Sequence, residues 1–243
     1  MGFENRTVCI AVSGSDAGIA CAKNYLDLGA RVAVYYNEPE RIRTLDTEKF
    51  GDKLKLIQIS DFKNADELIK AGEGVIGEWE KIDIAVAAVT MADNEKGLDM
   101  SEEEYQDILK TISSGTLFFI QPLLQNMMDH DYGRVAIVMS IGGRINLPGV
   151  SPAYAAANAS LGGITRNIAS TAGVHYVTAN AVAVGPLTDG SYKAGTSDVK
   201  GIIAGHETGT PEDVAKAVEY LTADLASWTT GEILDLNGGF LMI

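Results

Sequence analysis

The chain has 243 residues, of which 46% are hydrophobic and 21% charged, a composition typical of one large globular α/β domain. Its formal net charge of −14 disfavours nucleic acid and anionic membranes as partners. The chain has two cysteines, three isolated histidines, no leader-like start and no apolar run of membrane length. These features favour a cytoplasmic protein without a metal site.

Strands and helices alternate along the first half of the chain. Apolar, β-branched runs predict buried strands at residues 7–12, 31–36, 54–59 and 82–89. A glycine-bearing turn at residues 13–20 leads into a helix that ends near Asp27, and a second helix is expected at residues 65–80. The fourth run is apolar throughout, which is typical of a central parallel strand that is buried on both faces.

The second half continues the alternation. A capping-box pattern at Ser101 predicts a helix that runs towards Met128. Further strands are predicted at 134–139, 177–184 and 232–236, and further helices at 152–172 and 211–224. Residues 188–209 are glycine-rich and irregular. The pattern predicts one domain over residues 1–243, a Rossmann-like doubly wound parallel sheet with helices on both faces.

One stretch, from Ser140 to Asn158, carries the candidate chemistry. Ser140 ends a predicted strand, and Tyr154 and Asn158 lie four residues apart on one face of the next helix. A serine and a tyrosine brought together above a sheet predict a site that protonates or deprotonates a substrate oxygen.

Several short motifs occur along the chain in a fixed order. They are Ser13-Gly14 to Gly18-Ile19, Asp83, Gly133-Arg134-Val135 before Ser140, Tyr154, Asn180 to Gly185, Pro211-Glu-Asp-Val-Ala, and Thr230-Gly231 to Gly238-Gly239. In this order and spacing the chain resembles the short-chain dehydrogenase/reductase family over nearly its whole length. The resemblance implies a Rossmann sheet, an NAD(H) or NADP(H) cofactor, a tetramer, and catalysis through Ser140 and Tyr154. It implies cofactor contacts at Gly14, Ser15, Gly18, Ile19, Asn158, Gly185 and Leu187.

Five positions depart from the pattern that the resemblance implies. Asn158 stands where the family has a lysine, and Ile112 stands where it has a relay asparagine. Ala87 to Thr90 replace the family's Asn-Asn-Ala-Gly run. No ribose-binding acid lies near Tyr36, and Asp189 replaces the threonine that contacts the diphosphate. A neutral carboxamide brings no charge that favours a phenolate, so we expect Tyr154 to be a poor base that can still donate a hydrogen bond. Together these departures predict weak catalysis and weakened NAD(H) binding by this chain.

Three functions remain open. In the first, the chain is a catalytically degenerate subunit with an assembly role beside an active homologous subunit, in a hetero- or homotetramer. The complex would be an NAD-dependent hydroxyacyl-CoA-type dehydrogenase, similar to those that act on 2-(hydroxy(phenyl)methyl)succinyl-CoA in anaerobic toluene degradation, with a small-molecule or acyl-CoA substrate. In the second, the chain is an active atypical NAD(P)-dependent oxidoreductase that uses Tyr154 and Ser140, with Asn158 holding the ribose. In the third, it is a cofactor-independent, non-redox enzyme on the same fold.

Small residues on the helix at 152–172 favour assembly. Alanines surround Tyr154, and Gly162-Gly163 follows one turn after Asn158, so another helix can approach closely. The resemblance implies that this helix lies in a subunit interface.

Overall fold

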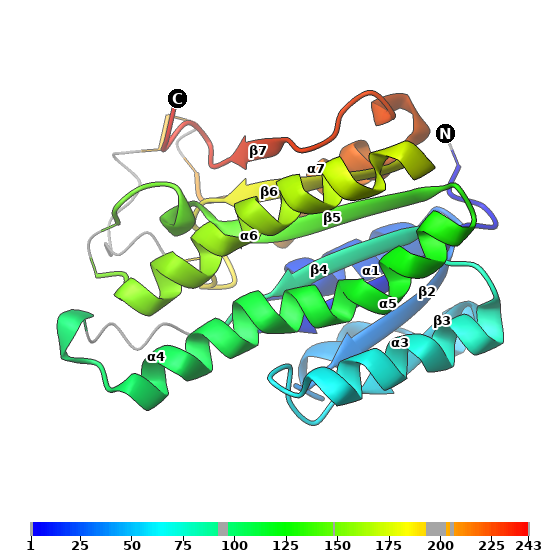
Figure 1. Ribbon diagram of the computed structural model, residues 1–243, viewed down its shortest axis with the longest axis horizontal. Coiled ribbons are helices and arrows are strands. Elements are labelled where there is room, and N and C mark those ends of the chain that lie inside the picture. The colour runs from blue at the N-terminus through cyan, green and yellow to red at the C-terminus, as the bar shows by residue number, and fades with distance from the viewer. Residues whose placement is uncertain (1, 92–96, 148, 193–202, 205–206, 243) are drawn as a thin grey trace.

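A seven-stranded parallel sheet forms the centre of the molecule, with the strand order β3-β2-β1-β4-β5-β6-β7 (Figure 1). The computed structural model describes residues 2–91, 97–147, 149–192, 203–204 and 207–242. The strands are β1 (Thr7–Ser13), β2 (Arg31–Tyr36), β3 (Leu54–Gln58), β4 (Ile84–Val89), β5 (Gly133–Ser140), β6 (Val177–Val184) and β7 (Ile233–Leu236). Every neighbouring pair is parallel. The predicted doubly wound, Rossmann-like sheet is therefore confirmed.

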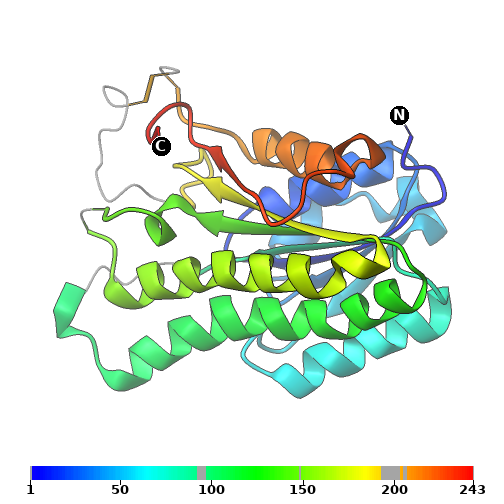
Figure 2. The ribbon, with the colours of Figure 1, turned by 45° about the horizontal axis from the view of Figure 1, so that its top comes forward.

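Helices cover both faces of this sheet (Figure 2). They are α1 (Ala17–Asp27), α2 (Thr47–Phe50), α3 (Ala65–Trp79), α4 (Glu102–Leu109), α5 (Gly115–Asp129), α6 (Pro152–Ala172) and α7 (Pro211–Thr222). Side chains alternate along each strand, so Val8 and Ile10 pack with α1 and α7, whereas Cys9 and Ala11 pack with α3, α5 and α6. The sheet thus separates two hydrophobic cores.

The expected helix after Ser101 is present but is not uniform. Its start has the predicted capping box: the Ser101 hydroxyl accepts the Glu104 N–H at 3.2 Å, and the Glu104 carboxylate accepts the Ser101 N–H at 2.8 Å. Between α4 and α5, residues Lys110–Ser114 form a π-helical turn. Such turns are frequent at functional sites, and Thr111 of this one lines the cavity described below.

Predicted and observed boundaries differ by one or two residues at most of the remaining elements, as helix and strand ends usually do. The sequence did not predict α2 or the short 3₁₀ segment Arg41–Thr44. Most of the irregular segment expected at 188–209 lies outside the described residues. At its ends, Leu187 and Gly209 form an isolated parallel bridge.

Among the described residues, no helix combines the length and the hydropathy that a membrane span requires. The same residues include no group of three or more His, Cys, Asp or Glu side chains arranged to hold a metal ion. Cys9 and Cys21 are buried free thiols that pack in separate cores, on opposite faces of the sheet.

Candidate functional site

A cavity of about 570 Å³ lies at the carboxyl edge of the sheet. Loops that follow the first six strands form its walls, together with the start of α6 and the π-helical turn. The chain leaves β1 towards β2 on one side and leaves β4 towards β5 on the other, so a crevice opens between the two central strands. In open α/β sheets, ligands bind in this crevice.

The glycine turn after β1 is required by packing alone. Gly14 has φ +71°, and a Cβ there would lie 2.4 Å from the Thr90 carbonyl oxygen. A Cβ at Gly18 would lie 2.7 Å from Cγ2 of Val12. Both glycines therefore let the turn and α1 approach the strands closely, whether or not a ligand binds.

A carboxylate of the chain lies at the N-terminus of α1. Asp189 Oδ2 accepts the Asp16 N–H at 2.9 Å and the Ser15 hydroxyl at 3.2 Å. Its Oδ1 accepts the Ser191 N–H at 2.9 Å and the Ser191 hydroxyl at 2.5 Å. Burial opposes ionisation of Asp189, but these hydrogen bonds outweigh it and lower its pKa. The positive end of a helix dipole is where this fold usually binds phosphate, and here it faces an internal anion.

A second carboxylate lies on the glycine turn. Glu38 Oε1 accepts the Gly14 N–H at 2.8 Å, and its other oxygen accepts a hydrogen bond from Arg41 Nε at 2.5 Å. Arg41 also pairs with Asp16 at 2.9 Å. The sequence shows no acid at Tyr36, where the resemblance implies a ribose contact, but Glu38 two residues later lines the cavity and bonds to main chain.

Tyr154 enters the cavity from the first turn of α6. The Ser151 hydroxyl caps this helix by accepting the Tyr154 N–H at 3.2 Å. The Tyr154 hydroxyl lies 3.1 Å from Oγ1 of Thr90, and either group can donate the hydrogen bond. In the sequence, Thr90 stood out only as the last residue of the run that replaces the family's Asn-Asn-Ala-Gly motif. A polar residue directly after an apolar central strand is the signal that would have found it.

The Asn158 side chain bonds to the main chain of the two other candidate residues, Ser140 and Tyr154. Its Oδ1 accepts the Ser140 N–H at 2.8 Å, and its Nδ2 donates to the Tyr154 carbonyl at 2.9 Å. The side chain is buried, with 1% of the residue exposed. The carboxamide therefore fastens α6 to the end of β5 and does not line the cavity.

Ser140 has a structural partner as well. Its hydroxyl accepts the Gly142 N–H at 3.0 Å and caps the short turn after β5, and the residue is fully buried. Ser140 and Tyr154 are thus linked through Asn158, but only Tyr154 reaches the cavity wall. The hydroxyl pair on this wall is Tyr154 with Thr90.

Most of the remaining predicted positions lie outside the cavity wall. Ile112 is buried in the π-helical turn, while its neighbour Thr111 lines the cavity. Gly185 packs against Asn237, since a Cβ would lie 2.9 Å from the Asn237 Cβ. Leu187 and Ile19 are buried in the core beside α1. Of the predicted cofactor contacts, Gly14 lines this cavity, and Ser15 reaches it through Asp189.

Comparison with known proteins places the chain in a family. Residues 12–241 match the family model described as enoyl-(acyl carrier protein) reductase. Nodulation protein G of Rhizobium meliloti is 29% identical over 245 residues, covering 99% of both chains. The 3-oxoacyl-[acyl-carrier-protein] reductase FabG of Rickettsia felis is 29% identical over 241 residues, covering 96% of both chains.

Solved structures share the fold. The crystal structure of gox2181 superposes with a TM-score of 0.88 at 23% identity, covering 98% of this chain and 96% of that one. A short-chain type dehydrogenase/reductase from Mycobacterium ulcerans gives 0.89 at 20% identity, with coverage of 99% and 91%. The matched family model, the parallel sheet and the tyrosine at its carboxyl edge lead to one assignment. This chain belongs to the short-chain dehydrogenase/reductase family of oxidoreductases.

Proposed function

We propose that this chain is a catalytically degenerate subunit that assembles beside an active homologous subunit of an NAD-dependent hydroxyacyl-CoA-type dehydrogenase. The observation that carries the proposal is Asn158. At the position where the family resemblance implies a lysine, the chain has a neutral carboxamide whose two ends bond to main chain at Ser140 and Tyr154. It supplies no charge to stabilise a phenolate, and its hydrogen bonds serve the fold.

The cofactor side supports the same proposal. The family typically binds NAD(P)H, but the N–H groups of Gly14 and Asp16 bond to the carboxylates of Glu38 and Asp189. A diphosphate would need those donors and would meet two negative charges. The residues present therefore do not fit the cofactor. Tyr154 and Thr90 can still offer a hydrogen bond to a ligand.

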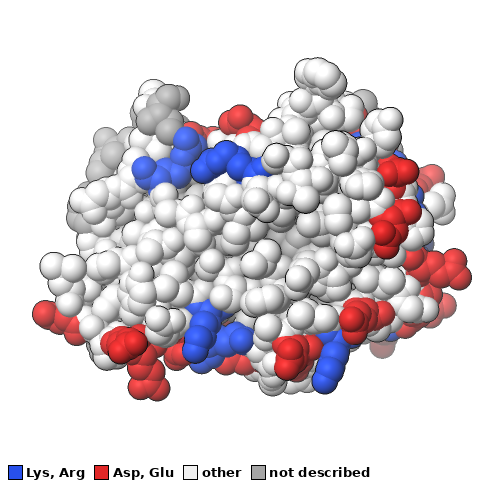
Figure 3. All heavy atoms as spheres, in the orientation of Figure 1, with Lys and Arg blue, Asp and Glu red and all other residues white. Residues whose placement is uncertain are grey.

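The surface formed by α5 and α6 supports a role in assembly. Each of these helices has one charged residue. It is Asp129 in α5, at the end of the helix, and Arg166 in α6. Figure 3 shows the face over these helices as largely uncharged, with acidic and basic side chains gathered around its rim. Small exposed residues on α6, Ala159 and Gly163, allow close approach by another helix. An uncharged face with a charged rim is suited to a subunit interface.

Affinity purification of the tagged chain from its own cells tests the proposal. We expect a homologous chain with an intact Tyr-xxx-Lys motif to co-purify. The complex should oxidise a hydroxyacyl-CoA with NAD, and the isolated chain should not. Tyr154→Phe in this chain should leave turnover by the complex unchanged. Turnover by the isolated chain that Tyr154→Phe abolishes would refute the proposal.

A pair of surface variants tests the interface. Ala159→Arg places a charge on the exposed face of α6 and should prevent co-purification of the partner. Gly77→Arg places the same charge at an open, exposed position of α3 and should not, because no atom lies within 4 Å of a Cβ there. Equal effects of both variants would show that the α6 face is not the interface.

A second candidate is an active reductase. It is favoured by the whole-length match to a protein named 3-oxoacyl-[acyl-carrier-protein] reductase and by the Tyr154 hydroxyl in the cavity wall. This candidate requires NADPH- or NADH-dependent reduction of a 3-oxoacyl thioester by the isolated chain. The Tyr154→Phe experiment distinguishes the two functions.

A further inference from the structure

The cavity contains the chain's own anion at the end of α1, where this fold usually binds phosphate. We propose that Asp189 is a built-in substitute for phosphate, which makes the cavity select an uncharged, hydrogen-bonding ligand of nucleoside size over phosphorylated ligands. The inference rests on the proposed function in one respect, since both require the native chain to leave dinucleotides unbound.

The geometry around Asp189 is that of a bound anion. Its carboxylate receives four hydrogen bonds from three residues in two segments of the chain: Ser15 and Asp16 at the start of α1, and Ser191 in the loop after β6. Main-chain N–H groups and hydroxyls at a helix N-terminus are the donors that a phosphate uses. A phosphate ester that enters the cavity must displace the carboxylate from these donors or remain without them.

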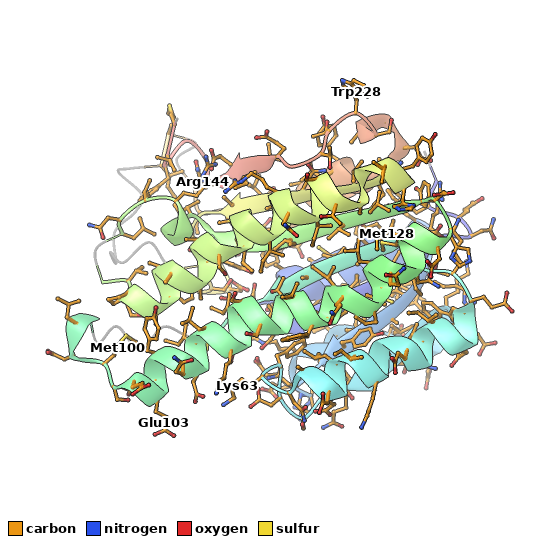
Figure 4. All side chains as sticks on the ribbon, in the orientation of Figure 1. Lys63, Met100, Glu103, Met128, Arg144 and Trp228 are labelled. Atoms are coloured by element: carbon orange, nitrogen blue, oxygen red, sulfur yellow. The ribbon has the colours of Figure 1, made fainter. Side chains whose placement is uncertain are left out.

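The other charges of the wall add to this exclusion. Arg41 and Lys63 line the cavity, but each is already paired with two carboxylates: Arg41 with Glu38 and Asp16, and Lys63 with Asp61 and Asp107 at 3.3 Å each. Figure 4 shows Lys63 between the start of α3 and the α4–α5 helix. Three carboxylates, Glu38, Asp61 and Asp189, line the cavity against these two cations. An incoming anion therefore meets a wall with an excess of negative charge.

Two polar groups of the same wall lack hydrogen-bond partners among the described residues. The Tyr192 hydroxyl is buried without a hydrogen-bond partner among the described residues, and 2% of this residue is exposed. The Asn37 Oδ1 is likewise buried without a partner. Buried polar groups normally have partners. The carboxylates that line the cavity can accept hydrogen bonds from the N–H and O–H groups of an uncharged ligand, and the cavity volume lies in the range of small-molecule sites.

Calorimetric titrations with adenosine and ADP test the proposal, because these probes differ only by the diphosphate. The native chain should bind adenosine saturably and bind ADP at least tenfold more weakly, equivalent to about 1.4 kcal/mol. Asp189→Asn removes the charge and keeps the shape, and Asp189→Ala also vacates the position. Both should strengthen ADP binding at least tenfold and leave adenosine binding within twofold. Thermal unfolding of each variant verifies that it is folded.

Asp61→Asn is the matched control. It removes one negative charge from the same cavity wall but leaves the N-terminus of α1 bonded to Asp189. It should strengthen ADP binding far less than the Asp189 variants do, because the donors at the start of α1 stay occupied. An equal gain in Asp61→Asn, or no gain in either Asp189 variant, would overturn the role given to Asp189. Absence of adenosine binding by the native chain would overturn the ligand class.

The outcomes also separate this inference from the proposed function. Tight binding of ADP or NADH by the native chain would refute both. If the native chain binds neither and the Asp189 variants gain nothing, only the role of Asp189 fails.

Discussion

At the scale of single residues, Asn158 shows how one side chain can change its task. A lysine there would be long and charged, whereas the carboxamide is short enough to bond to Ser140 and Tyr154 main chain below the cavity. The sequence revealed the missing charge but not the two hydrogen bonds. The Ser140 N–H lies 18 residues away in the chain, and only packing of α6 against β5 brings it to Asn158. The Tyr154 carbonyl lies one turn earlier on the same helix.

Asn158→Ala should lower the free energy of unfolding by about 1–3 kcal/mol. It leaves the buried Ser140 N–H without its partner, a loss that costs about 1–3 kcal/mol, whereas the Tyr154 carbonyl keeps its bond within the helix. Urea unfolding followed by circular dichroism measures the change. Asn167→Ala on the exposed face of the same helix is the control, and it should change stability by about 0.5 kcal/mol or less. Similar values for the two variants would contradict the structural role of Asn158.

Gly14→Ala should lower the free energy of unfolding by more than the cost of placing an alanine in the left-handed backbone region. Gly14 and Gly97 both have positive φ, +71° and +59°, but only at Gly14 does a Cβ meet main chain, at 2.4 Å from the Thr90 oxygen. We expect Gly97→Ala to cost about 1 kcal/mol and Gly14→Ala clearly more. Thermal unfolding compares them. Equal losses would mean that the turn can move away from β4.

At the scale of elements, the pattern of apolar residues was sufficient for most helices and strands. β2, α6 and β6 begin and end where the sequence predicts, because Pro152 and the β-branched runs are strong local signals. The π-helical turn Lys110–Ser114 was not predicted. It contains no breaker, and the residue after it, Gly115, packs so closely on Phe62 that a Cβ would lie 2.8 Å from the Phe62 oxygen. This contact depends on another segment of the chain.

A pair of glycine substitutions in α3 tests how closely this helix packs on α5. A Cβ at Gly72 would lie 2.6 Å from Cγ of Pro122, whereas a Cβ at Gly74 would meet no atom within 4 Å. Gly72→Ala should therefore destabilise the protein by about 1–3 kcal/mol through overpacking. Gly74→Ala should stabilise it by about 0.5–1 kcal/mol, because alanine favours the helix. Chemical unfolding of both variants measures the difference, and a loss at Gly74 would contradict this arrangement.

At the scale of the whole molecule, the buried thiols predict sensitivity to alkaline pH. Burial raises the pKa of Cys9 and of Cys21 to about 12, whereas the pKa of an exposed thiol is about 8.5. The unfolded chain therefore releases these protons first as the pH rises. The contribution to stability is complete below about pH 8.5 and is lost as the pH rises from there towards the folded pKa.

Urea midpoints at pH 7.5 and 9.5 measure this effect. The midpoint should be lower at pH 9.5 for the native chain, and the decrease should be smaller when Cys9 and Cys21 are both replaced by alanine. Unfolded tyrosines, whose pKa is about 10, are only partly ionised at the upper end of this interval, and the double variant shows the share due to the two thiols. An unchanged decrease in the double variant would show that other groups cause the alkaline loss.

The sequence by itself determined the fold and the family resemblance, because both depend on local periodicity and on motifs in a fixed order. It also identified Tyr154, and it noted Asn158 and Asp189 as departures. Only the tertiary structure decided what the residues that differ from the family pattern do. Asp189 reaches the start of α1 across 173 residues of chain, and Thr90 meets Tyr154 across 64. Such contacts arise where parallel strands bring their carboxyl ends to one edge, and no local pattern encodes which side chains then bond to each other.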